Sequence, residues 1–265
     1  MSPYREGPAA PAPNVLICSG LDPSGGAGFL VDARVVQNLG GRPVGVITSL
    51  TVQNTRGMRS CHELDREVLG AQLNALLTDI EIRACKIGIL GSQDVVRELG
   101  EHLDLTRAPV VWDPIIAPTQ GDVLFGPELF KLALEALGRH LTLITPNSQE
   151  LGLLVGAEIT NLAEAVEGAK VFASIAKVAV LVKGGHLGTD QSVDVLCHEG
   201  GVEYLKGQRL PSTDVHGTGC ALSSAIATHL ALGLPLVDAC REAKQYVAER
   251  IAHPVSPGRG APAVL

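Results

Sequence analysis

Aromatic side chains are scarce in this chain of 265 residues: they make up 3% of it, with a single tryptophan. Proteins that bind single-stranded nucleic acids stack the bases on aromatic rings, so this composition disfavours that function. A formal net charge of −7 disfavours binding to a phosphate backbone or to an anionic membrane surface. We therefore expect no nucleic-acid partner and no membrane partner.

Paired cysteines are also absent. The six cysteines stand singly, without any Cys-x-x-Cys spacing, and several of them lie within apolar runs, as Cys18 does. This is not the pattern of a disulfide framework or of a zinc site, and it indicates buried free thiols in a reducing compartment. We expect a cytoplasmic protein.

The first residues lack the apolar stretch of a signal peptide or of a membrane span. Residues 1–13 are rich in proline and alanine instead, and we interpret them as a flexible leader. No internal repeat and no low-complexity linker follows, so residues 14–265 are predicted to form a single domain.

Aliphatic side chains supply most of the hydrophobic residues, which make up 46% of the chain. Short β-branched runs alternate with amphipathic segments along the sequence, which is typical of an α/β fold with helices covering a mainly parallel sheet. The predicted strands are 14–19, 43–51, 84–90, 109–113, 141–145 and 178–183, followed by a hairpin of 192–197 and 202–206. The predicted helices are 28–39, 66–79, 92–103, 127–137, 162–176, 220–232 and 235–252.

The segment His216-Gly217-Thr218-Gly219-Cys220 places a glycine turn directly before a helix of small apolar residues. Free backbone N–H groups meet the positive end of the helix there, which favours an anion such as a transferring phosphoryl group. A cysteine at a helix start has its thiolate stabilised, so we expect the pKa of Cys220 to fall toward neutrality and the thiolate to take a proton from a substrate hydroxyl. The pattern predicts kinase chemistry without a Walker loop, although a turn with an N-cap and no ligand explains Gly-Thr-Gly equally well.

Polar and glycine-rich segments follow several predicted strands, at the edge where open parallel sheets bind ligands. Residues 19–28 follow the first strand; their glycines allow close approach to a ligand, but they lack the Gly-x-Gly-x-x-Gly spacing of dinucleotide-binding folds. Gln53 follows the second strand, and its amide offers the donor and acceptor that match the edge of an aminopyrimidine. The alternatives are a tight strand-to-helix turn for residues 19–28 and an ordinary loop residue for Gln53.

Three later strands end at residues suited to phosphate chemistry. Asp113 ends one strand, and Asn147 and Glu150 lie three residues apart at a helix start, where they can order Mg²⁺ and its waters. The same spacing predicts an N-cap with a capping glutamate, and the two uses are compatible. Lys183 follows a strongly apolar strand and either reaches a phosphate across the crevice or is a solvated lysine at a strand end. His186 has no assigned role.

In this order, these segments resemble the hydroxymethylpyrimidine and phosphomethylpyrimidine kinases of thiamine biosynthesis, a branch of the ribokinase-like superfamily. The resemblance covers residues 14–262 and rests on Gly-Leu-Asp-Pro-Ser-Gly-Gly-Ala-Gly at 20–28, Val-Gln-Asn-Thr at 52–55, Lys-Ile-Gly at 86–88, Asp-Pro at 113–114, Thr-Pro-Asn-x-x-Glu at 145–150, Lys-Gly-Gly-His at 183–186 and His-Gly-Thr-Gly-Cys at 216–220. It implies a three-layer α/β/α sandwich around a mostly parallel sheet, with ATP and Mg²⁺ as cosubstrates. The implied reaction transfers the terminal phosphate to the hydroxymethyl group of an aminopyrimidine or to its monophosphate. We expect a homodimer.

The resemblance also assigns roles to single residues. Cys220 stands where sugar kinases of the superfamily carry a catalytic aspartate, and the residues before it match the anion hole. Ile89 stands where a methionine often lines the pyrimidine pocket, a mild change of shape. The implied site comprises Cys220, Gly217, Thr218 and Gly219 for catalysis, Gly20, Asp32, Gln53 and Ile89 for the substrate, Lys183, Thr218 and Gly219 for the nucleotide, and Asp113, Asn147 and Glu150 for the metal.

Two segments depart from the family pattern. After Asp-Pro the family commonly has Val-Met-Val-Ala-Lys-Ser-Gly, whereas residues 115–121 read Ile-Ile-Ala-Pro-Thr-Gln-Gly and lack that lysine and serine. We expect this loop to close differently and the transfer to the monophosphate to be the weaker step. Residues 212–215, Ser-Thr-Asp-Val, replace the usual Lys-Asn-Thr type run before the anion hole.

Two rival functions stay open. One is a pyridoxal kinase of the same cysteine-bearing type, because one scaffold serves many alcohols in this superfamily; against it, Gln53 favours the aminopyrimidine. The other is a catalytically weak binding or regulatory protein that retains the fold, which the altered loop at 117–120 suggests.

Overall fold

The computed structural model describes residues 11–116, 126–185, 187, 191–210 and 215–264. Most of the predicted leader, the departing loop from residue 117, His186 and residues 212–214 lie outside these ranges.

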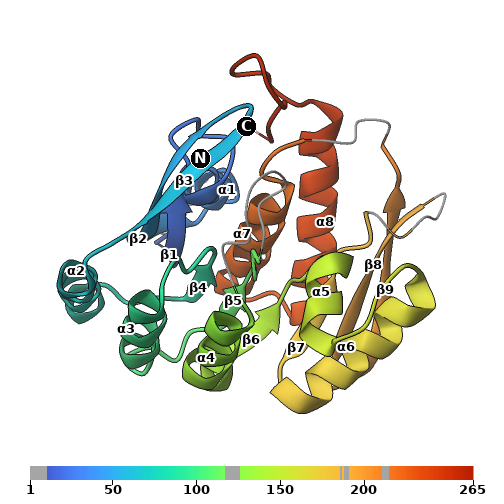
Figure 1. Ribbon diagram of the computed structural model, residues 1–265, viewed down its shortest axis with the longest axis horizontal. Coiled ribbons are helices and arrows are strands. Elements are labelled where there is room, and N and C mark those ends of the chain that lie inside the picture. Colours follow the sequence, from blue (N-terminus) through green and yellow to red (C-terminus); the bar gives the residue numbers. More distant parts are fainter. Residues whose placement is uncertain (1–10, 117–125, 186, 188–190, 211–214, 265) are drawn as a thin grey trace, which may run out of the picture.

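In the described residues, the strands form one sheet of nine, in the order β3-β2-β1-β4-β5-β6-β7-β8-β9 (Figure 1). Parallel pairing joins the six in the middle, which are β2 (Arg42–Asn54), β1 (Asn14–Leu21), β4 (Ala84–Ile87), β5 (Val110–Trp112), β6 (Leu141–Ile144) and β7 (Ala179–Val182). Antiparallel pairing adds β3 (Gly57–Glu63) at one edge, and β8 (Gln191–His198) and β9 (Gly201–Gln208) at the other. The mostly parallel sheet and the hairpin near its end are therefore as predicted.

Helices cover both faces of the sheet, which confirms the predicted three-layer sandwich (Figure 1). One face carries α2 (Arg66–Asp79), α3 (Gln93–Leu103), α4 (Pro127–Leu137), which continues into the 3-10 turn η1 (Gly138–His140), α5 (Ser148–Val155) and α6 (Leu162–Ala176). The other face carries α1 (Gly28–Asn38), α7 (Thr218–Ala231) and α8 (Leu236–Ala252). Because α7 contacts the sheet, α1 and α8, it is buried around most of its circumference, and this explains its run of small apolar residues.

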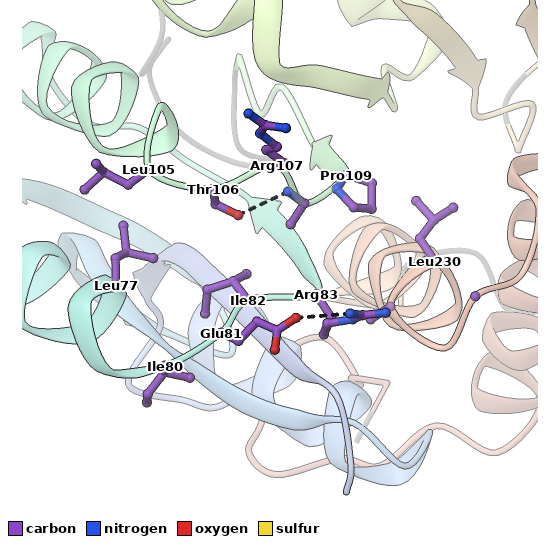
Figure 2. A pocket seen from close by; sticks show the side chains of 13 residues that line it. Leu77, Ile80, Glu81, Ile82, Arg83, Leu105, Thr106, Arg107, Pro109 and Leu230 are labelled. Carbon is purple, nitrogen blue, oxygen red and sulfur yellow. Dashed lines mark hydrogen bonds and ion pairs between the residues drawn. The ribbon is translucent and has the colours of Figure 1, made fainter. Parts of the chain in front are cut away.

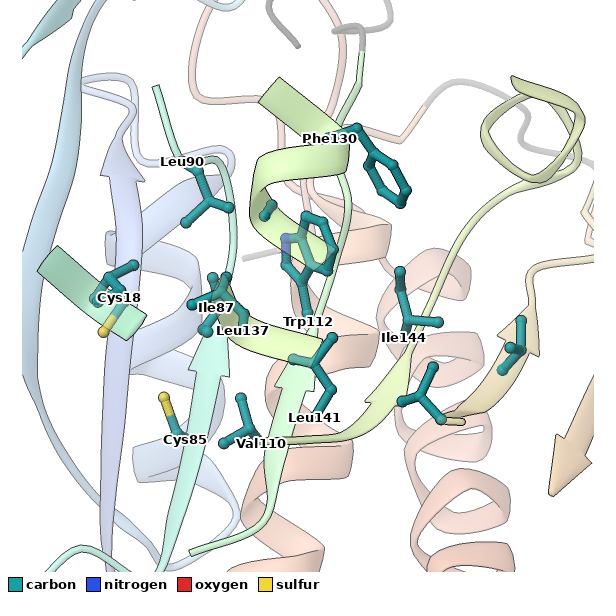
Figure 3. Close-up of a cluster of buried hydrophobic side chains, with 14 of the residues drawn as sticks. Cys18, Cys85, Ile87, Leu90, Val110, Trp112, Phe130, Leu137, Leu141 and Ile144 are labelled. Carbon is teal, nitrogen blue, oxygen red and sulfur yellow. The ribbon is translucent and has the colours of Figure 1, made fainter. Parts of the chain in front are cut away.

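Successive residues of the central strands enter opposite hydrophobic layers. In β1, Leu16 and Cys18 join the layer under α2, α3 and α4, whereas Val15 and Ile17 join the layer under α7. Figure 3 shows the first of these layers, in which the Trp112 ring stacks on Phe130 with 5.2 Å between the ring centroids. A strand buried on both faces is what a continuous apolar run predicts.

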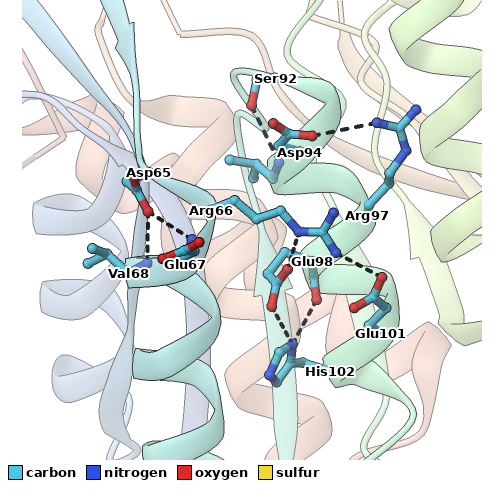
Figure 4. A network of polar contacts seen from close by, with 11 residues as sticks. Asp65, Arg66, Glu67, Val68, Ser92, Asp94, Arg97, Glu98, Glu101 and His102 are labelled. Atoms are coloured by element: carbon cyan, nitrogen blue, oxygen red, sulfur yellow. Dashed lines mark hydrogen bonds and ion pairs between the residues drawn. The ribbon is translucent and has the colours of Figure 1, made fainter.

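A polar network fixes α2 against α3 (Figure 4). Asp65 caps α2 by accepting hydrogen bonds from two backbone N–H groups, and Arg66 pairs with Glu98 of α3 at 2.6 Å and with Glu101 at 3.0 Å. Glu98 fits because Gly70 faces it: a Cβ at that position would lie 2.1 Å from the carboxylate.

Three elements differ from the sequence-based prediction. Strand β2 continues to Asn54, so Gln53 lies on a strand rather than in a loop, and the following strand β3 was not predicted. Both strands run beyond the sheet as a half-exposed ribbon, whose polar residues resemble those of a loop. For helix α5, sequence analysis predicted only the cap formed by Asn147 and Glu150 and not the extent of the helix.

Candidate active site

The predicted site residues gather at the carboxyl ends of the parallel strands, next to the start of α7. Asp113 follows β5, Asn147 follows β6, and Lys183 follows β7. The last two are joined by a parallel β-bridge. This is the edge at which open parallel sheets bind ligands.

A glycine turn opens α7. Gly217 has φ of +84°, and a Cβ there would lie 2.2 Å from the carbonyl oxygen of Gly26, so the position requires glycine. The Lys183 ammonium lies 3.4 Å from the position that a Cβ of Gly219 would take. A lysine and the positive end of a helix therefore meet at one point, and both attract an anion.

Lys183 holds two acidic side chains together. Its Nζ lies 2.8 Å from Asp113 Oδ1 and 3.6 Å from Glu150 Oε2. The Thr145 hydroxyl donates to the same Asp113 oxygen at 3.1 Å. Burial alone would lower the pKa of Lys183, but the charges of Asp113 and Glu150 outweigh burial and raise it. The lysine stays charged at every physiological pH.

Asn147 and Glu150 form the predicted capping box at the start of α5. The Glu150 N–H donates to Asn147 Oδ1 at 2.8 Å, and the Asn147 N–H donates to Glu150 Oε2 at 2.7 Å. Burial, and then the charge of Asp113, raise the pKa of Glu150 against the opposing effect of Lys183.

The buried carboxylates of Asp113 and Glu150 provide the hard oxygen ligands that Mg²⁺ prefers. Within the described part of the chain, no group of three His, Cys, Asp or Glu side chains is arranged to hold a metal ion. Mg²⁺ is commonly bound through one or two carboxylates, several waters and substrate phosphates, and Asp113 with Glu150 fits that ligand set.

The prediction of a lowered pKa for Cys220 is wrong. Cys220 is the third residue of α7, but its side chain is only 6% exposed. Burial raises the pKa of the thiol to about 11; the charges of Asp32 and Asp113 add to the rise, whereas Lys86 opposes it. Loss of solvation outweighs the helix end, so the thiol is protonated at neutral pH.

A fully buried ion pair lies beneath Cys220. The Lys86 ammonium lies 2.6 Å from Asp32 Oδ2, and the Ser224 hydroxyl of α7 donates to Asp32 Oδ1 at 2.7 Å. Both oxygens of Asp32 are engaged, and its side chain is fully buried. Direct contact of Asp32 with a substrate stays a prediction, and the burial of the side chain argues against it. Asp32 instead positions Lys86.

Gly20 and Ile89 lie next to each other, and their contact with the substrate stays a prediction. A Cβ at Gly20 would lie 2.5 Å from Ile89 Cγ2 and 2.7 Å from the hydroxyl of Ser49. Gly28 closes the same turn with φ of +60°, because a Cβ there would lie 2.2 Å from the Gly20 carbonyl oxygen.

Gln53 belongs to a polar cluster that sequence reasoning missed. Its Nε2 lies 3.2 Å from Asp22 Oδ2 and 3.0 Å from His216 Nε2, and the last two atoms lie 3.1 Å apart. Burial alone would raise the pKa of Asp22, but hydrogen bonds from His216 and Ser24 outweigh burial and lower it. The cluster links the ribbon, the first strand end and the turn before α7.

One feature of the sequence could have identified Asp22. It precedes Pro23 directly after β1, just as Asp113 precedes Pro114 after β5. His216 has no comparable feature, because only the fold brings it beside residues 163 positions away.

A hollow of about 490 Å³ lies elsewhere, between the ends of α2 and α7 and the loop before β5 (Figure 2). Its lining includes Leu77, Arg83, Arg107 and Leu230 and contains none of the predicted site residues. The hollow therefore lies at the amino ends of β4 and β5, whereas the predicted site residues lie at the carboxyl ends of the strands.

No described helix is both long enough and apolar enough to span a bilayer.

Comparison with known proteins shows which family the chain is related to. The family model described as phosphomethylpyrimidine kinase matches residues 22–264. A hydroxymethylpyrimidine/phosphomethylpyrimidine kinase of Mycobacterium tuberculosis is 38% identical, with 96% of this chain and 94% of that protein covered. The thiamine biosynthesis multifunctional protein ThiED of Corynebacterium efficiens is 36% identical, and the match spans 34% of its length.

Solved structures agree with this result. A phosphomethylpyrimidine kinase from Clostridium difficile has a TM-score of 0.78 at 31% identity, over 91% of this chain and 99% of that chain. A pyridoxal kinase from Staphylococcus aureus in complex with AMP-PCP has a TM-score of 0.87 at 25% identity, over 96% and 93% of the two chains. The fold is ribokinase-like, and the chain belongs to the phosphomethylpyrimidine kinase family.

Proposed function

We propose that this ATP-dependent kinase phosphorylates the hydroxymethyl group of an aminopyrimidine alcohol, the monophosphate of that alcohol, or both. The observation that carries the proposal is the meeting of Lys183, the start of α7 and the Cys220 thiol at the edge where Gln53 also lies. Three parts of a phosphoryl transfer site are thus adjacent: an anion site, a proton acceptor and a group that recognises the acceptor substrate.

The start of α7 and Lys183 bind the phosphates of ATP. The backbone N–H groups of Thr218 and Gly219 point out of the helix end, and the charge of Lys183 lies beside them. Both are fixed before the substrate arrives, so they stabilise the charge of the transferring group without rearrangement.

Cys220 acts as the general base. The oxygen of the substrate hydroxyl attacks the terminal phosphorus, the bond to the leaving ADP oxygen breaks, and the hydroxyl proton passes to the Cys220 sulfur. Since its pKa of about 11 leaves the thiol protonated at neutral pH, the base form is a minority species in the free enzyme.

Asp113 and Glu150, with the capping Asn147 beside them, would hold a hydrated Mg²⁺. The ion would neutralise phosphate charge during the transfer. The support for this proposal is the pair of buried carboxylates next to the phosphate-binding lysine.

A pyridoxal kinase is the second candidate, favoured by the structural similarity to the Staphylococcus aureus enzyme. A panel of hydroxymethylpyrimidine, its monophosphate and pyridoxal, assayed with ATP and Mg²⁺, separates the two functions. The proposal requires the highest kcat/KM for one of the pyrimidines. A preference for pyridoxal would establish the second candidate, and no turnover with any of the three would favour a binding or regulatory protein.

We further propose a homodimer in the cytoplasm. Leu50 and Val52 on the projecting β2–β3 ribbon are 41% and 47% exposed, which suits a surface covered by a second copy. All six cysteines are free thiols, which suits a reducing compartment.

Replacing Gln53 by leucine is expected to lower kcat/KM for the aminopyrimidine, because about 1 to 3 kcal/mol of transition-state binding is lost. The amide that pairs with the pyrimidine edge is lost, together with its contacts to Asp22 and His216. Steady-state kinetics should show a nearly unchanged KM for ATP. Equal losses toward the pyrimidine and pyridoxal would mean that Gln53 does not set specificity.

Replacing Glu150 by glutamine is expected to raise the Mg²⁺ concentration that gives the half-maximal rate, because one anionic oxygen ligand is removed. Glu164 is a matched control: it is a first-turn glutamate of α6 that also follows a capping asparagine, and it is exposed. The Glu164→Gln variant should titrate like the wild type. If Glu150→Gln does so too, Glu150 only caps α5.

A further inference from the structure

The segment Val255–Val264, called the strap below, leaves the end of α8 and crosses to the β2–β3 ribbon (Figure 1). Val255 and Ala263 pair with each other through two backbone hydrogen bonds of 2.9 and 2.8 Å. The strap therefore folds back on itself, and its second half lies along the site. Ala263 and Val264 are buried, whereas residues 255–259 are exposed.

The strap binds the turn of the ribbon. The Ala261 N–H donates to the Thr55 carbonyl oxygen at 2.8 Å, and the Gly260 N–H donates to the Thr55 hydroxyl at 3.1 Å. A Cβ at Gly260 would lie 1.9 Å from that carbonyl oxygen, so the two backbones touch. Thr55 lies two residues after Gln53, so these two hydrogen bonds hold the turn of the ribbon close to Gln53.

The strap also binds the residue before the glycine turn of α7. The His216 N–H donates to the Pro262 carbonyl oxygen at 2.7 Å, and the Val264 N–H donates to the His216 carbonyl oxygen at 3.1 Å. Val264 also packs 3.2 Å from the position that a Cβ of Gly217 would take. Five consecutive residues, 260–264, thus connect the ribbon turn to the start of the phosphate site.

We propose that the strap is a positioning element of the active site, which fixes Gln53 relative to His216 and the start of α7 and thereby sets the affinity for the acceptor alcohol. This inference rests on the proposed function. A two-stranded ribbon that projects from a sheet is only marginally stable alone. The side-chain contact between Gln53 and His216 is lost if the ribbon bends, and the strap restrains that bending through the backbone on both sides.

The first test replaces Gly260 by alanine, which pushes the strap away from Thr55. We expect the KM for the alcohol to rise about tenfold or more, with the KM for ATP and the melting temperature nearly unchanged, because a shift of about 1 Å in a positioning group is enough to misplace a substrate. Gly138 is the control: it follows α4 with φ of −51°, and a Cβ there would meet no atom within 4 Å. Gly138→Ala should behave as the wild type.

A second pair of variants guards against misfolding of the first. Thr55→Val keeps the shape of the side chain but removes the acceptor of the Gly260 N–H, and Thr55→Ser retains a hydroxyl. The valine variant should raise the KM for the alcohol, and the serine variant should restore it to within about twofold of the wild type. Equal rises in both KM values together with a lower melting temperature would reduce the strap to a structural role and overturn the proposal. So would an unchanged KM for the alcohol in both Gly260→Ala and Thr55→Val.

Amide hydrogen exchange without any substrate tests the coupling separately from the function. In Gly260→Ala, peptides covering 50–57 and 215–222 should both exchange faster than in the wild type, since local opening of the strap exposes both. Unchanged exchange in either peptide would overturn the proposed coupling. A wild-type enzyme inactive on the alcohol but with coupled exchange would instead count against the proposed function and leave the strap in place.

Discussion

Replacing Cys220 by alanine is expected to lower turnover about 100- to 10,000-fold, with substrate affinity nearly unchanged. The variant keeps the α7 amides and Lys183, so it still binds and orients ATP, but no group remains at this position to take the hydroxyl proton. Cys240 is the matched control, because it is also a buried helical cysteine whose pKa is raised, to about 12. Cys240→Ala should retain wild-type turnover, and near-normal turnover of Cys220→Ala would remove Cys220 from the mechanism.

The same thiol predicts the pH dependence of the wild type. Because the pKa of Cys220 is raised to about 11, the thiolate fraction grows about tenfold per pH unit below that value. The kcat/KM for the alcohol should therefore rise between pH 7 and 9, and the rise should be missing from the residual activity of Cys220→Ala. If kcat/KM of the wild type stayed constant over this range, ionisation of Cys220 in the free enzyme would not control the proton transfer. The bound substrate or another group would control it instead.

The sequence was sufficient to predict the layers of the fold. In β1, Val15 to Cys18 form an apolar run too short for a helix, and burial of both faces requires a parallel sheet with helices on each side. The same logic predicted that residues following separate strands meet at one edge, and Asp113 and Lys183 do so at 2.8 Å.

The ionisation state of Cys220 was not predictable in this way. A helix start lowers the pKa of a thiol, whereas burial raises it, and the sequence gives no measure of how deeply α1 and the sheet enclose α7. The contact between Gln53 and His216 is equally non-local. It depends on the β2–β3 ribbon, which sequence analysis did not predict because the polar residues Gln53, Asn54 and Thr55 are typical of a loop.

The pairing of Lys86 with Asp32 is a further tertiary feature, and it predicts a large effect on stability. Lys86 interrupts the apolar strand β4, and both side chains are fully buried. Burial alone would lower the pKa of Lys86, but the charge of Asp32, together with that of Asp113, outweighs burial and raises the pKa. The charged pair is therefore maintained inside the protein.

Replacing Lys86 by methionine is expected to lower the free energy of unfolding by about 3 to 5 kcal/mol, because it leaves the carboxylate of Asp32 buried without its partner. Urea denaturation should show a partial recovery in the double variant Lys86→Met with Asp32→Asn, which removes both charges and keeps an acceptor for Ser224. The exposed pair of Arg241 and Asp238 is the control, and Arg241→Met should cost less than about 1 kcal/mol.

The loss in Lys86→Met should also depend on pH. Burial raises the pKa of Asp32, and without Lys86 nothing as strong opposes that rise. A carboxyl whose pKa is higher in the folded than in the unfolded state favours folding while it is protonated, and this contribution disappears as the pH rises above about 4. The destabilisation of Lys86→Met should therefore be small near pH 4 and grow toward pH 8. A loss that is independent of pH, or a double variant as unstable as the single one, would show that lost packing around Lys86, rather than the unpaired charge of Asp32, destabilises the protein.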